Sequence, residues 1–259
     1  MVPLKIRALA TLPLAGLFAI ASACGEDSGA GGASGTGGTG GEGGTGGAAP
    51  TVTFTGNFGS FPEFEPIEDG EVCFVVEGAN DRCTPTGIEG AYALAGLPTN
   101  TQGTLRFTGP GVVDFHWVLS TTEQDVALPE LWPEGPATLA AWYAQAALAT
   151  DEGGAVLQVQ VNATDPEGWV IELDPATAEG PYYWDGNWTA GDSMLDLDAT
   201  ETGATPIGIF LNVDANGGPY AVKATRGMTE CTKVEHSGPI SPWKVPAGAD
   251  EVFVQLDCR

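Results

Sequence analysis

From Pro50 onward, apolar and polar residues alternate in short runs that are separated by Gly, Pro, Asn and Asp. Such period-2 runs between turn residues are typical of β-sandwiches or barrels, and they do not fit β-α-β units. The runs form two sets. The first set predicts strands at 51–58, 71–77, 91–97, 103–107 and 112–119, and the second at 155–162, 169–173, 181–184, 193–197, 207–213, 220–225 and 252–257.

Residues 136–149 between the two sets carry the pattern of an α-helix. Pro136 stands near the start, and Leu139, Trp142, Tyr143 and Ala146 follow at i, i+3, i+4 and i+7. We expect this apolar stripe to pack on an open side of one sandwich or in the crevice between domains. The predicted fold is therefore all-β, with two small Ig-like or prealbumin-like β-sandwich domains at 50–130 and 153–259, joined by one helix within 131–152.

Two local patterns make the second set more specific. Asn216-Gly217 lies between the runs at 207–213 and 220–225 and predicts a two-residue hairpin turn, since both residues tolerate positive φ. In the last run, alternation places Val252, Val254 and Leu256 on one face, which we expect to be core. The same alternation places Phe253, Gln255 and Asp257 on the other face, which we expect to be in solvent.

The N-terminal segment has the layout of a secretory signal peptide over residues 1–23, with Lys5 and Arg7 before an apolar run at 8–21. It ends in Ala21-Ser22-Ala23-Cys24, which resembles the lipobox of bacterial lipoproteins of the myxobacterial type, although Ala21 stands where that family usually has Leu. The resemblance implies a lipid on Cys24; the alternative is an ordinary Ala-x-Ala cleavage site. Residues 24–49 are mostly Gly, Ser, Thr and Ala and predict a flexible tether.

Charge and motifs exclude several function classes. The chain has 34 Asp and Glu against 9 Lys and Arg, a net charge of −25, which argues against nucleic acid as a partner. GxSxG, HExxH and Walker motifs are all absent from the sequence. Of the two histidines, His116 shares a strand face with Asp114, so that a His–Asp pair is possible, and His236 falls in an expected loop. We therefore predict no catalytic residue, no cofactor and no enzymatic activity.

The stretch Gly90-Ala91-Tyr92-Ala93-Leu94-Ala95-Gly96-Leu97-Pro98 resembles the G-x-Y-x-L-x-G-L-P segment of carboxypeptidase regulatory-like domains. The order of 168–173, 182–183, 200–203 and 210–213 is similar to a diverged second copy. This resemblance implies prealbumin-like sandwiches, and in such families the domain is usually a non-catalytic accessory or interaction module. The first copy departs from the pattern, because Gly87-Ile88-Glu89-Gly90 replaces the usual Asp-x-x-Gly turn.

Five cysteines in an exported chain leave one without a partner, which supports Cys24 as the modified residue. The other four allow three disulfide connectivities, of which pairing within each domain, Cys73 with Cys83 and Cys231 with Cys258, is the simplest. A zinc site is the alternative, but C-x2-C spacing is absent. Asn212–Gly217 and three aspartates offer calcium ligands; a turn and solvated carboxylates explain both, and we predict no metal. The three aspartates are Asp192, Asp196 and Asp198.

The segment from Pro181 to Trp188 places four large rings within seven residues, beside Asp185 and Asn187. Ring stacking with nearby polar groups is how proteins hold sugars, so Tyr183, Trp184 and Trp188 are the candidate carbohydrate-binding residues. The favoured alternative is that Tyr182 or Tyr183 and Trp184 belong to the core, with Trp188 covering the sandwich end.

The features together predict a non-catalytic, lipid-anchored protein outside the cytoplasm, in the periplasm or on the cell surface. It would act as an interaction or structural module for an unidentified envelope protein or polysaccharide. The alternative function is a carbohydrate-binding module that uses the cluster at 182–188.

The anchor gives the first testable prediction. Cys24→Ala should release the protein from the membrane fraction, because a lipid on the Cys24 thiol would be its only attachment. Mass spectrometry of the wild-type N-terminus should detect acyl groups on that residue. An unmodified Cys24 in the purified protein would contradict the prediction.

Overall fold

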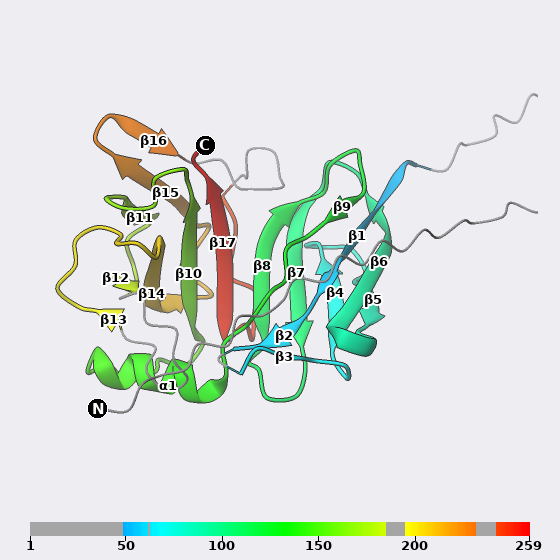
Figure 1. The fold of residues 1–259 in the computed structure, drawn as a ribbon, viewed down its shortest axis with the longest axis horizontal. Helices are drawn as coiled ribbons and strands as arrows, with labels where there is room; N and C mark the ends of the chain where they lie inside the picture. Colours follow the sequence, from blue (N-terminus) through cyan, green and yellow to red (C-terminus); the bar gives the residue numbers. More distant parts are fainter. Residues whose placement is uncertain (1–48, 62, 185–194, 232–241) are drawn as a thin grey trace, which may run out of the picture. The chain divides into compact units, whose positions relative to one another are not determined.

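The two predicted sets of strands meet in one nine-stranded sheet, with the order β13-β12-β14-β10-β17-β8-β7-β4-β5. The computed structural model describes residues 49–61, 63–184, 195–231 and 242–259, so Cys24 and the signal peptide lie outside the described residues (Figure 1). The strands are β4 (Glu71–Val75), β5 (Arg82–Pro85), β7 (Gln102–Thr108), β8 (Phe115–Ser120), β10 (Gly154–Asn162), β12 (Glu179–Trp184), β13 (Leu195–Asp196), β14 (Ile207–Asp214) and β17 (Glu251–Asp257).

Smaller sheets complete two sandwiches, which confirms an all-β fold with a single α-helix in the described part of the chain. Their orders are β6-β1-β9, β11-β15-β16 and β2-β3. The elements are β1 (Thr51–Asn57), β2 (Gly59–Ser60), β3 (Glu65–Pro66), β6 (Ala91–Pro98), β9 (Val126–Ala127), β11 (Val170–Asp174), β15 (Ala221–Arg226), β16 (Thr229–Cys231), a 3-10 turn (Ile88–Gly90) and α1 (Pro136–Gln145).

The two sandwiches use opposite faces of the nine-stranded sheet. Trp117 and Leu119 of β8 belong to the first core, together with Phe54 of β1 and Leu94 of β6. Val118, which points the other way, belongs to the second core with residues of β10, β11 and β17. Because side chains alternate between the faces of a strand, the β6-β1-β9 sheet covers one face of the large sheet and β11-β15-β16 covers the other.

Strand β17 joins the halves, since it pairs in parallel with β8 on one side and with β10 on the other (Figure 1). Its Val252, Val254 and Leu256 are fully buried in the second core, as the alternation predicts. The expectation of solvent on its other face is wrong for Phe253, which packs against Phe115 and Trp117 of the first core. The described residues form one compact unit, and separate folding of 50–130 and 153–259 stays a prediction.

Helix α1 begins at Pro136 as predicted, after the N-cap residue Gly135, and ends at Gln145, four residues before the predicted end. Leu139, Trp142 and Tyr143 are buried against the outer face of the second sandwich, which confirms that the apolar stripe covers an open side. The Gln145 amide donates to the Leu195 carbonyl at 2.6 Å and accepts from the Leu195 N–H at 2.8 Å. In the described part of the chain, no helix is long and apolar enough to span a membrane.

The hairpin predicted at Asn216-Gly217 is wrong. A turn does form there, because the N–H groups of Asn216 and Gly217 donate to Asp214 at 2.7 and 3.1 Å. The flanking strands do not pair, since β14 bonds to β10 and β12 whereas β15 bonds to β11 and β16. The turn residues therefore reverse the chain, but packing sends the two strands into opposite layers of the second sandwich.

Both predicted disulfides are present. Cys73 and Cys83 face one another across β4 and β5, ten residues apart in sequence. Cys231 at the end of β16 joins Cys258 just after β17, 27 residues apart, and so links the two layers of the second sandwich. Each bridge closes its loop within one sandwich.

The two loop lengths predict different contributions to stability. Loss of a disulfide restores loop entropy to the unfolded chain, so Cys73→Ser with Cys83→Ser should cost about 2 to 3 kcal/mol, and Cys231→Ser with Cys258→Ser about 3 to 4 kcal/mol. Urea unfolding of the two double variants measures both values. The reverse ranking would contradict the loop-entropy account.

Candidate functional site

The aromatic segment at 182–188 lies mostly within the protein interior where it is described. Tyr183 is 1% exposed, and its hydroxyl accepts the Ile171 N–H at 3.1 Å; burial is the main cause that raises its pKa. Trp184 is 3% exposed, with its ring 5.8 Å from that of Phe61 and 5.7 Å from that of Trp142. Both rings are thus almost completely buried, as core side chains are, and Trp188 lies outside the described residues.

The structure brings His116 and Asp114 together, with Nε2 and Oδ1 3.0 Å apart. His116 is buried, whereas Asp114 is partly exposed. The other histidine, His236, lies outside the described residues. Asp196 is one of the three aspartates considered as calcium ligands. Its carboxylate accepts hydrogen bonds from the N–H groups of Asp198 and Ala199, as a solvated carboxylate in a turn does.

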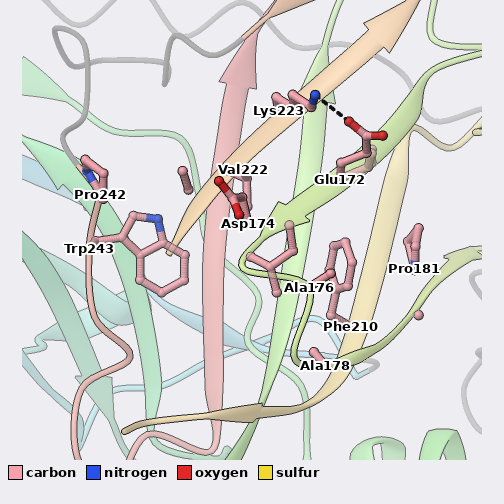
Figure 2. A pocket seen from close by; sticks show the side chains of 14 residues that line it. Glu172, Asp174, Ala176, Ala178, Pro181, Phe210, Val222, Lys223, Pro242 and Trp243 are labelled. Carbon is pink, nitrogen blue, oxygen red and sulfur yellow. Dashed lines mark ion pairs between the residues drawn. The ribbon is translucent and has the colours of Figure 1, made fainter. Parts of the chain in front are cut away.

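A pocket of about 470 Å³ opens on the second sandwich, between β11 and β15 on one side and the start of β12 on the other. Figure 2 shows Phe210, Val222 and Trp243 around it. These three side chains are almost completely buried and give the pocket an apolar floor. The small side chains of Ala176 and Ala178, in the connection from β11 to β12, leave the space open.

Charged groups lie on one side of this pocket. The Lys223 ammonium is 2.7 Å from a Glu172 carboxylate oxygen across β15 and β11, and both side chains are about half exposed (Figure 2). The hydrogen bond from Lys223 to Glu172 is the main cause that raises the lysine pKa. Asp174 adds a second carboxylate to the lining. The pocket therefore combines an apolar floor with an acidic, solvated rim.

Strand order explains why the pocket exists. In the described part of the chain, β11 pairs with β15 alone, and β13 pairs only with Tyr183 and Trp184 of β12. One side of the second sandwich is consequently open between β11 and the beginning of β12. The lining comes from segments at 171–181, 210, 221–223 and 242–243, and no local sequence motif connects them. The small residues and prolines at 175–181 are a local signal of a loosely filled connection.

Comparisons with known proteins add only distant similarity. No protein-family model and no curated protein sequence matches the chain. The Bacillus anthracis TIE protein is similar over 80% of this chain, at 9% identity and a TM-score of 0.28; the match covers 33% of that protein, so this chain spans about a third of its length. Shaft pilin SpaA from Lactobacillus rhamnosus GG matches over 81% of this chain and 98% of its own, at 10% identity and a TM-score of 0.22. A streptococcal ancillary pilin matches over 80% and 69%, at 10% identity and a TM-score of 0.23.

The burial of Trp184 predicts a structural role for its ring. Trp184→Ala should cost about 3 to 5 kcal/mol, because it leaves a cavity between Phe61 and Trp142. The control Leu197→Ala, on a side chain that is 45% exposed, should change stability by less than about 1 kcal/mol. Thermal melts of the two variants provide the comparison, and a near-wild-type melt of Trp184→Ala would refute the structural role.

Proposed function

We propose that this chain is a non-catalytic interaction module of the bacterial envelope, held at a membrane by a lipid on Cys24 and displayed on the flexible tether. Its partner is an extended segment of another envelope protein, which binds at the pocket of the second sandwich. The observation that carries this proposal is the open side of that sandwich, where an apolar pocket adjoins the free edge of β11.

Strand β11 supplies the backbone groups for such an interaction. Its residues 171–174 line the pocket, and in the described part of the chain it has a neighbouring strand on one side only. The Ile171 N–H already donates to the Tyr183 hydroxyl, so an added strand would pair with the remaining groups of that edge. A strand at a sheet edge presents N–H and C=O groups that can pair with an added strand. Peptide recognition by strand addition takes its affinity from these bonds and its specificity from side-chain pockets.

The lining favours a peptide over a sugar. Trp243 is 6% exposed and packs against Tyr220 with ring centroids 5.9 Å apart, so little of its ring is accessible for stacking on a sugar. Phe210 and Val222 instead suit an apolar side chain that enters from outside. Because Glu172 and Asp174 stand beside the pocket and the chain carries 25 excess negative charges, a basic residue next to that apolar side chain would improve the match.

Two further observations support a location outside the cytoplasm. Disulfides persist in oxidising compartments, and this chain has one in each sandwich. The signal-like segment and the Gly-rich tether precede the folded part. With about 5 to 6 Å × √n for Gly-rich chains, the tether gives a reach of roughly 25 to 30 Å, enough for the module to stand clear of a membrane surface.

A blocked pocket tests the proposal. Ala176 is exposed and lines the pocket, so Ala176→Arg should fill it without loss of core contacts. The matched control is Ala141→Arg on the exposed side of α1. Affinity capture from envelope extracts should retain a protein partner on wild type and on Ala141→Arg, and at least tenfold less of it on Ala176→Arg. The free energies of unfolding of the three proteins should agree within about 1 kcal/mol.

The outcomes separate the two functions. Equal capture by all three proteins would show that the pocket is not the contact site. Retention of polysaccharide in place of protein, unaffected by Ala176→Arg, would support the carbohydrate-binding alternative and overturn the proposal.

A further inference from the structure

A second cavity, of about 210 Å³, lies where the two sandwiches meet, on the face of the large sheet opposite the second core. Six aromatic rings contribute to its lining. They are Phe61, Phe64, Phe115, Trp132, Trp184 and Phe253. This cavity is distinct from the pocket of the second sandwich, with which it has no lining residue in common.

The ionisable groups that line this cavity, among the described residues, are all carboxyls: Glu130, Glu134 and Glu251. Glu134 is 3% exposed and Glu251 is 1% exposed. Buried carboxyls ordinarily have a cationic partner or a full set of hydrogen bonds, because desolvation of the charge is costly. A cationic partner is missing from the described lining, so hydrogen bonds alone must compensate for the burial of these carboxyls.

Glu251 has its acceptors occupied, whereas Glu134 does not. The Gln158 side-chain amide donates to Glu251 Oε1, and the Glu134 backbone N–H donates to Glu251 Oε2 at 3.2 Å. The side chains of Gln158 and Thr138 also bond to Glu134. Its Oε2 atom is nevertheless buried without a hydrogen-bond partner among the described residues. Glu134, which lines the cavity, thus has one buried carboxyl oxygen without a hydrogen-bond partner.

Rings and carboxyls together select the type of ligand. An anion would be repelled, and a calcium ion would need six to eight oxygen ligands, which a wall made largely of rings does not provide. Aromatic faces attract organic cations, most strongly where water is excluded. A ligand with an N–H group would in addition satisfy Glu134 Oε2, which a fully methylated ammonium ion would leave unpaired.

We propose that this cavity binds a small organic ammonium ion with at least one N–H, which donates to Glu134 Oε2 and packs against the aromatic rings. Phe64 stands at the opening, because it is 45% exposed while its ring packs 5.2 Å from Phe61 and 5.3 Å from Trp132. Its φ of 54° is unusual for an aromatic residue. The cavity is smaller than the roughly 300 to 1,000 Å³ of drug-sized sites, which suits a small cation.

Proton linkage gives the binding a defined pH dependence. Burial is the largest cause that raises the pKa of Glu251 to about 8 and the pKa of Glu134 well above its usual range. Repulsion from the negative charge of Asp250 further raises the pKa of Glu251, and repulsion from Glu251 and Glu63 further raises that of Glu134. In the ligand-free protein these carboxyls hold protons that unfolding releases. Stability should therefore fall as pH rises from the usual carboxyl pKa of about 4.3 to about 8. Affinity for the ammonium ion should rise over the same interval.

The test uses purified full-length protein and n-propylammonium as the probe, with tetramethylammonium, 1-propanol and calcium as comparisons. Titration calorimetry at high pH should give a Kd of about 1 mM for so small a ligand. Tetramethylammonium should bind at least tenfold more weakly, and 1-propanol and calcium should not bind. The melting temperature of the protein should also fall less between pH 5 and pH 8 when propylammonium is present than when it is absent.

Two variants, each with a matched control, keep the test specific. Glu134→Gln should weaken propylammonium at least tenfold without lowering the melting temperature, because the amide carries no charge to desolvate; its control is Glu152→Gln, on an exposed residue. Phe64→Ala should weaken binding while the melt stays close to wild type; its control is Ile88→Ala, also exposed.

Other results would overturn the proposal. Equal binding of 1-propanol would reduce the cavity to an apolar space, and tighter binding of calcium would make it a metal site. Undiminished binding by Glu134→Gln, or no binding by wild type at high pH, would equally contradict it. None of these results depends on the envelope partner, so this proposal and the proposed function fail separately.

Discussion

Insertion of β17 between β10 and β8 is the interaction on which the rest of the structure depends. Buried N–H and C=O groups must be paired, and a central strand satisfies those of both its neighbours. Without β17, the first sandwich would expose the edge of β8 and the second the edge of β10. Small sandwiches bury a limited share of their surface. The last seven-residue strand therefore completes two cores at once.

The arrangement of the two sandwiches follows from this pairing. The first packs its small sheet on one face of the shared sheet and the second on the opposite face. Beyond each core, the uncovered part of the sheet needs another cover, which α1 provides over the second sandwich. Glu251 and Phe253 line the cavity between the part of this face that the first small sheet covers and the part that α1 covers. The cavity with aromatic rings and carboxyls forms at the boundary between these two covered parts of the sheet. The proposed peptide pocket forms at the free edge of β11.

Individual residues show how far the sequence could be interpreted. Alternation correctly placed Val252 and Val254 in a core, since it depends only on the geometry of one strand. It could not place Phe253, because the rings that pack against it, Phe115 and Trp117 of β8, lie more than 130 residues earlier. Asn216-Gly217 marked a turn correctly, but the choice of partners for β14 and β15 depends on which edges remain free. The aromatic segment at 182–188 is conspicuous in local composition, whereas the sequence around Glu134 contains no pattern that indicates a binding site.

The sequence by itself determined the strand-rich class and the start of the helix, and it favoured the two disulfides as the simplest of three connectivities. Each of these depends on local periodicity or on few alternatives. Tertiary structure decided the sharing of β17, the burial of Trp184 and the residues of both cavities. These features join segments that are far apart in sequence. Their free energy comes from contacts that exist only after the sheets have packed, so no window of sequence contains them.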